Sequence, residues 1–103
     1  MATAQRKIYR GWRDREGQHL THVLVNGHPL CHIHKHSSEM TWGYSGSGPA
    51  DLALSILTDY LGDEERAFQL HQQFKRHFVA GFDTSSWTLD SEQIENWLKQ
   101  PTS

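Results

Sequence analysis

Histidines are the most distinctive chemical feature of this chain. Eight of its 103 residues are histidine. Alternate residues of a strand share one face, so histidines spaced two apart would converge, and a neighbouring strand would add a fourth imidazole to a zinc site. The candidate ligands are His19, His32, His34 and His36. Such a run on an edge strand is more often an exposed polar face, because metal ligands need further hydrogen-bonding partners to orient them. We therefore expect no resident cofactor and keep zinc as an alternative.

A cysteine and a histidine form a second candidate arrangement. If Asn26 and Gly27 form a two-residue hairpin loop, the register places Cys31 opposite His22. A cysteine beside a base is a candidate nucleophile. However, we find no third group that would orient the histidine, and a lone cysteine in a strand is usually a small buried hydrophobe. No complete catalytic motif occurs elsewhere, so we expect a protein that is not an enzyme.

A glycine-rich loop runs from Trp42 to Asp51 and precedes an expected helix. Free amides at the start of that helix would attract an anion, which makes a small-molecule or nucleotide site an alternative function. Against this, we expect Asp51 in the first helical turn, where its carboxylate would repel a bound anion. No lysine follows the glycines at the P-loop position. We favour a corner, capped by Ser47 or Gly48, that presents aromatic side chains to a partner. The residues predicted to bind are Trp42, Tyr44, Ser45, Ser47 and His36.

Composition limits the classes of partner. A net charge of −2 and a pI near 6.4 provide no overall field that would attract nucleic acid or anionic lipid. One basic stretch keeps nucleic-acid binding as an alternative, although charged and aromatic residues also alternate on solvated strand faces. This stretch contains Arg6, Lys7, Arg10, Arg13 and Arg15, interleaved with Tyr9 and Trp12. The four tryptophans cannot all fit a core of this size, so at least one should lie at the surface and favour partner contacts.

Three features that the sequence lacks indicate where in the cell the protein is expected. The single cysteine cannot form an internal disulfide, and the N-terminus lacks the apolar segment of a secretory signal. No apolar run approaches the roughly 18 residues that would cross a bilayer. We therefore expect a cytoplasmic protein that does not contact membranes.

The first half of the chain has strand patterns. Residues 8–13 and 18–25 favour strands, and Asn26-Gly27 is the strongest short-range hairpin signal. A partner strand would begin at His28 and continue through the histidine run, with Val25 opposite His28 and Thr21 opposite His32. A fourth short strand is expected at residues 40–42.

The second half has helix patterns. One helix begins near Pro49 and ends at Gly62. A second begins with Asp63 as its N-cap and stops at Gly81. A third has a capping box and a hydrophobic staple, formed by Asp90 with Gln93 and by Leu89 with Ile94.

These patterns predict an α+β fold in a single domain spanning residues 1–103. A three- or four-stranded antiparallel sheet would form from a β-rich half at 6–44, and about three helices from a helical half at 49–99 would pack on one face. Short flexible termini would flank the domain.

The chain also resembles a family of small uncharacterised domains found in bacteria and their phages and plasmids. The matching residues are Tyr9 and Gly11, the run from Asn26 to Leu30, His36 with Ser37, the loop beginning at Trp42, and Trp87. The match departs from the pattern at Ser45, where glycine is usual, and at Asp51, where glutamine is common. His32 and His34 are peculiar to this chain. The resemblance implies a fold but no reaction.

The expected function is therefore that of a small non-enzymatic intracellular binding module that acts by protein–protein contact. Small phage- and plasmid-borne domains of this kind often act as accessory proteins or as inhibitors of host defence, which the resemblance suggests by analogy. Binding of a small molecule or nucleotide at the glycine-rich loop, and of zinc at the histidines, are the alternatives.

Overall fold

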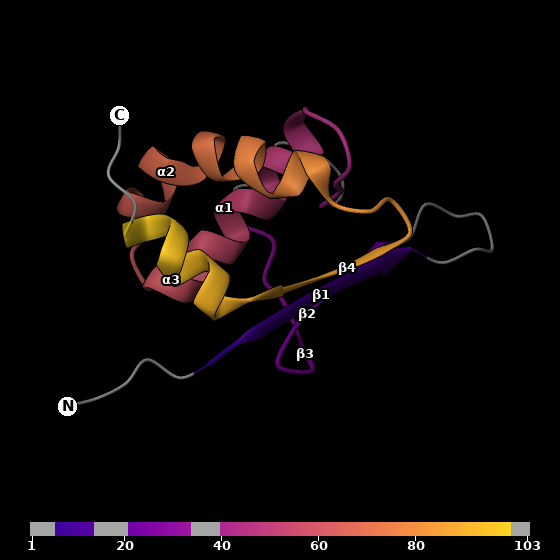
Figure 1. Cartoon of the computed structure of the whole chain (residues 1–103), viewed down its shortest axis with the longest axis horizontal. Helices are drawn as coiled ribbons and strands as arrows, with labels where there is room; N and C mark the ends of the chain where they lie inside the picture. Colours follow the sequence, from indigo (N-terminus) through magenta and orange to yellow (C-terminus); the bar gives the residue numbers. More distant parts are fainter. Residues whose placement is uncertain (1–5, 14–20, 34–39, 100–103) are drawn as a thin grey trace.

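The computed structural model places three helices on one face of a four-stranded antiparallel sheet (Figure 1). It describes residues 6–13, 21–33 and 40–99. The elements are β1 (Ile8–Arg13), β2 (Thr21–Val25), β3 (His28–Pro29), α1 (Ser47–Leu61), α2 (Glu64–His77), the 3₁₀ turn η1 (Val79–Gly81), β4 (Ser86–Asp90) and α3 (Ser91–Lys99). The predicted α+β fold class is confirmed.

The strand order is β3-β2-β1-β4, and every neighbouring pair is antiparallel. The β2–β3 hairpin has the predicted register, with Val25 opposite His28. Asn26 and Gly27 adopt φ values of 50° and 83°, as a type I′ turn requires. Two central residues that tolerate left-handed geometry therefore fix this register, as the sequence indicates.

Other predictions for the sheet were wrong. β3 ends at Pro29, so His32 does not pair with Thr21, whose hydroxyl instead donates to the carbonyl of Met40. Residues 40–42 are not a strand. The fourth strand is β4, which comes from the half predicted to be helical and pairs with the free edge of β1. Its alternation of buried Trp87 and Leu89 with more exposed neighbours is the period of two that a half-buried strand shows.

The helix ends follow their capping signals. Gly62 ends α1 in the left-handed region at φ 68°, and Asp63 then accepts a hydrogen bond from the Arg66 amide at 3.1 Å as the N-cap of α2. Two details differ from prediction: Gly46 is the N-cap of α1, and α2 ends at His77, before η1 continues to Gly81.

The predicted capping box of α3 is confirmed. The Asp90 carboxylate accepts from the Glu92 amide at 2.9 Å, and the Gln93 side chain accepts from the Asp90 amide at 3.0 Å. Leu89 and Ile94, the predicted staple, are both buried. No helix in the described ranges is long and apolar enough to cross a membrane.

The core between sheet and helices is centred on two indole rings. Trp42 and Trp87 meet edge to face with centroids 5.7 Å apart, and Phe82 stacks on Trp87 at 4.4 Å. Trp12 and Trp97 are only partly buried. No tryptophan is fully exposed, and Trp97 packs against the core cluster, so the prediction that at least one tryptophan lies at the surface is not confirmed.

A partly buried polar contact joins β1 to α1. The Tyr9 hydroxyl donates to the Asp59 carboxylate at 2.8 Å, and the Lys7 ammonium lies 3.0 Å from the same oxygen. Burial, and then the bond to Asp59, raises the pKa of the Tyr9 phenol strongly. Burial and the neighbouring Glu95 raise the pKa of Tyr60 to about 12. Folding therefore favours the neutral form of both phenols.

This preference predicts a loss of stability in alkali. A phenol whose pKa is higher in the folded state stabilises the fold fully below the unfolded pKa of about 10, and this contribution declines as pH rises above that value. The urea midpoint of the wild type should therefore fall between pH 9 and pH 11, and Tyr9→Phe should reduce the fall. Tyr44→Phe is the control, because Tyr44 is half exposed. An unchanged fall in Tyr9→Phe would contradict this role of Tyr9.

Candidate functional site

Trp42 is not at the surface, so its predicted role in a contact surface is wrong. The side chain is fully buried, and its indole nitrogen donates to the carbonyl of Thr84 at 3.2 Å. The Arg13 guanidinium lies 4.9 Å from the ring centroid and donates to the Trp42 carbonyl. The indole fills space between the sheet and the helices because it is the largest apolar group available at this corner.

Tyr44, by contrast, is 51% exposed. Its hydroxyl lies 2.9 Å from the Thr41 hydroxyl, and its ring lies against Gly46, where an added Cβ would come within 2.8 Å of Cε2. A Cβ at Gly48 would come within 1.9 Å of the Thr41 oxygen. These two glycines therefore let the tyrosine lie against the start of α1, as the predicted corner requires.

Two further residues of the predicted contact surface, Ser45 and Ser47, are exposed beside Tyr44. His36, the fifth predicted binding residue, lies outside the described residues. Gly43 closes the corner: its amide donates to the Val79 carbonyl at 3.1 Å, and its φ of 86° favours glycine.

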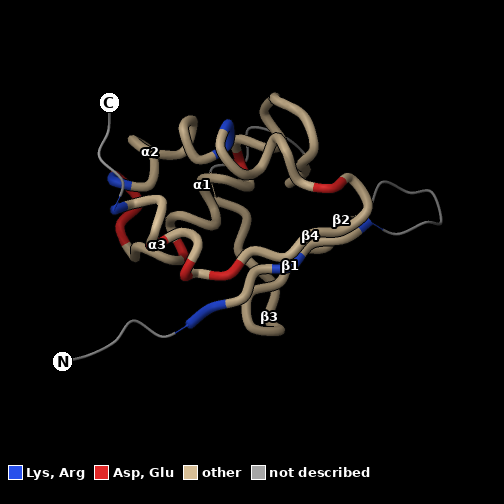
Figure 2. Tube along the Cα trace, viewed as in Figure 1, with Lys and Arg blue, Asp and Glu red and all other residues tan. Residues whose placement is uncertain are grey.

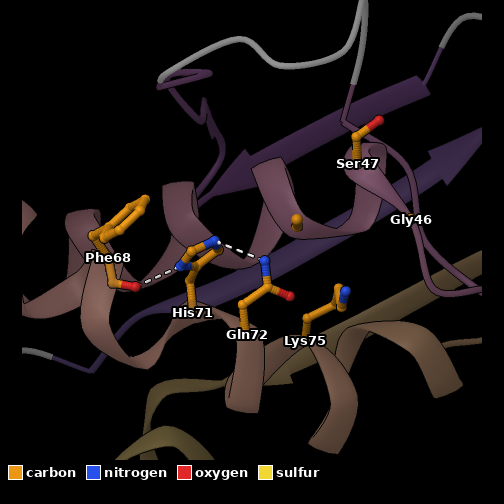
Figure 3. Close-up of a pocket in the computed structure, with 7 residues that line it drawn as sticks. Gly46, Ser47, Phe68, His71, Gln72 and Lys75 are labelled. Atoms are coloured by element: carbon orange, nitrogen blue, oxygen red, sulfur yellow. Dashed lines mark hydrogen bonds between the residues drawn. The ribbon is translucent and has the colours of Figure 1, made fainter.

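A pocket of about 350 Å³ lies between the first turn of α1 and the face of α2 that runs from Phe68 to Lys75. Figure 3 shows side chains from α2 projecting toward α1 across it. Its lining residues are Gly46, Ser47, Ala50, Phe68, His71, Gln72 and Lys75. Sequence reasoning found the α1 side of this pocket but missed the α2 side. The spacing of residues 68, 71, 72 and 75 predicts one shared helix face, but nothing in the sequence shows that this face meets the start of α1.

Lys75 is the one formally charged residue in the pocket lining. It is only 9% exposed, and no carboxylate or carbonyl among the described residues pairs with it. His71 is held by two contacts: Nδ1 lies 2.5 Å from the Phe68 carbonyl, and Nε2 lies 3.3 Å from the Gln72 amide nitrogen. The pocket lining therefore combines one lysine with residues that carry no formal charge apart from the histidine.

Asp51 does not occupy the position expected of it. It is the fifth residue of α1, is 1% exposed, and lies 2.9 Å from Nε2 of His32. No acidic residue lies in the first turn of α1. The carboxylate that was expected to repel an anion at this helix start is therefore buried against His32.

Three of the four candidate zinc ligands, His19, His34 and His36, lie outside the described residues, so the zinc site stays a prediction. The fourth, His32, makes the contact with Asp51 just described. In the described part of the chain, no group of three or more metal-ligating side chains gathers. β3 ends at Pro29, so Cys31 and His22 are not paired within the strand ladder. Cys31 is exposed, and His22 stacks on Trp12 with centroids 5.0 Å apart.

The basic stretch is largely occupied by internal contacts. Arg6 pairs with Asp90, Lys7 with Asp59, and Arg13 with backbone carbonyls. Figure 2 shows the basic start of β1 beside the acidic residues where β4 joins α3. Arg10 remains without a carboxylate partner among the described residues and lies 5.9 Å from the Trp12 ring centroid. Tyr9 is buried, and Arg15 lies outside the described ranges. Few groups of this stretch are thus available to bind phosphates.

Comparison with known proteins adds a family. A model described as a family of unknown function (DUF6166) matches residues 9–100. The resemblance to a family of domains of unknown function is thereby confirmed over most of the chain. No curated protein and no solved structure gives a significant match.

Proposed function

This chain belongs to the family of unknown function DUF6166, and for this member we propose a non-enzymatic role as a module that binds a protein partner. The contact surface is the pocket described above together with the exposed side chains around it, Tyr44, Ser45, Ser47 and Phe68. We call this surface the pocket face.

One observation carries the proposal. Tyr44 and Phe68 are the two large hydrophobic side chains that stay exposed in the described part of the chain, at 51% and 57%. Phe68 lines the pocket, and Tyr44 packs on Gly46, which also lines it. Exposed aromatic side chains beside a concavity are typical anchors of protein interfaces, because they bury much apolar area with little loss of conformational entropy.

The position of His71 favours binding over catalysis. Both of its ring nitrogens already contact groups of α2, so a substrate would have to displace one of these contacts before the imidazole could act as a general base. Inhibition of a host protein, as expected of an accessory protein of a phage or plasmid, is one form that such binding would take.

Removing both aromatic anchors should abolish partner capture. Tyr44→Ser combined with Phe68→Ser should reduce the yield of a specific partner from host lysate at least tenfold, because each anchor contributes about 2 kcal/mol when an interface buries it. Quantitative mass spectrometry of pull-downs measures the change. Trp12→Ser on the opposite face of the sheet is the matched control, and urea midpoints verify that all variants fold. Identical partner profiles for the wild type and the double variant would contradict the proposal.

A further inference from the structure

We propose that the pocket binds a carboxylate group of the protein partner, held between Lys75 and the N-terminus of α1. This inference rests on the proposed function and specifies its chemistry. The partner would present an acidic side chain, or its own C-terminus, next to an apolar side chain.

Lys75 supplies the first part of the argument. A lysine that is nine-tenths buried normally pairs with an acid, because an isolated buried charge is unfavourable. Lys75 has no such pair among the described residues, and its side chain lines the pocket. α1 and α2 form a hairpin through Gly62, so Lys75, near the end of α2, lies on the Gly46 and Ser47 side of the pocket (Figure 3). An anion in the pocket would supply the missing counter-charge.

The start of α1 is a second, independent feature that would attract an anion. Gly46 caps this helix without a side-chain hydrogen bond. Among the described residues, the amide of Ser47 donates to no acceptor. This amide lies at the positive end of the helix dipole, and Ser47 is exposed and lines the pocket. The Asp51 carboxylate contacts His32.

The lining residues favour a carboxylate over a phosphate. One ammonium and about half a positive charge from the helix dipole exceed the single negative charge of a carboxylate, so this group needs no second cation. A phosphate carries up to two negative charges and is usually bound by arginines, which present several donors at once. The pocket lining contains no arginine, and both ring nitrogens of His71 already contact groups of α2.

The end of the pocket opposite Lys75 would contact the apolar side chain that the partner presents next to its carboxylate. Phe68 and Lys75 are seven residues apart on α2, which is about 10 Å along a helix. The lining also includes Ala50. A ligand that joins a carboxylate to an apolar group would therefore contact both ends of the pocket.

A matched pair of small probes tests the chemistry. Titration of the full chain with 3-phenylpropionate, followed by amide chemical shifts in NMR, should give saturable shifts at Gly46, Ser47, Ala50 and Lys75. The neutral amide 3-phenylpropanamide should bind at least tenfold more weakly. Lys75→Met should weaken binding of 3-phenylpropionate about tenfold, whereas Arg76→Met, which removes the same charge from the exposed neighbouring residue, should leave it unchanged. Equal binding of acid and amide, or equal loss in both variants, would overturn the proposal.

Further experiments distinguish a carboxylate of a protein partner from other ligands. Tighter binding of inorganic phosphate or ATP than of 3-phenylpropionate at constant ionic strength would overturn the carboxylate assignment. In pull-downs, Lys75→Met should lose the partner that Tyr44→Ser with Phe68→Ser also loses. Loss in the aromatic variant alone would leave the proposed function standing and overturn this inference. Carboxylate binding with no partner that depends on Lys75 would overturn it in favour of a free small molecule.

Discussion

Replacing Trp42 by alanine should lower the free energy of unfolding by about 3–5 kcal/mol, the range for truncating a fully buried aromatic side chain. The indole has three kinds of contact to lose. The Trp42 ring packs edge to face with the ring of Trp87 and lies under the Arg13 guanidinium. Its indole nitrogen donates a hydrogen bond to the Thr84 carbonyl. Its loss would leave a large cavity between the sheet and the helices, which the rigid neighbouring indole cannot fill.

Urea unfolding followed by far-UV circular dichroism measures this effect. Tyr44→Ala is the comparison within the same loop and should cost about 1 kcal/mol, because its ring is half exposed and loses one hydrogen bond. The two variants should also separate in function: Trp42→Ala should lose partner binding only as far as it unfolds, whereas Tyr44→Ala should lose it while folded. Equal stability losses in the two variants would contradict the assignment of Trp42 to the core and Tyr44 to the surface.

This division shows what the sequence of the loop does not determine. Trp42 and Tyr44 flank a glycine, so no periodicity of two or 3.6 assigns either ring to the interior. The positive φ of Gly43 turns the chain between them and sends one ring inward and the other outward. The glycines predict a corner, but only the packing of the sheet against α1 decides which aromatic fills the core.

Elements whose signals are local were predicted well. The caps at Gly62, Asp63 and Asp90 depend on hydrogen bonds within four residues, and each lies at the predicted position. β4 was missed because its pairing partner β1 lies more than 70 residues away. The α2 side of the pocket was missed for the same reason: a helix face can be read from spacing, but its neighbour across the hairpin cannot.

Gly11→Ala should lower the free energy of unfolding by about 2 kcal/mol, although alanine is normally tolerated in a strand. An added Cβ would lie 2.4 Å from the indole nitrogen of Trp87, on the strand that pairs with β1. That indole cannot move aside easily, because Phe82 stacks on it and Trp42 meets it at 77°. Overpacking a rigid core typically costs about 1–3 kcal/mol. The glycine of the Tyr9-x-Gly11 pattern therefore serves the packing of Trp87.

Two comparisons isolate this cause. Gly81→Ala should change stability by less than about 1 kcal/mol, or raise it slightly, because an added Cβ there meets nothing within 4 Å and the φ is not positive. In a Trp87→Phe background, Gly11→Ala should cost much less than in the wild type, since the smaller ring leaves room for the methyl group. The difference between the two costs, measured by urea unfolding, is the coupling energy of the pair. A coupling near zero would mean that Gly11 is required for backbone conformation, and Trp87 would then need another explanation for its place against β1.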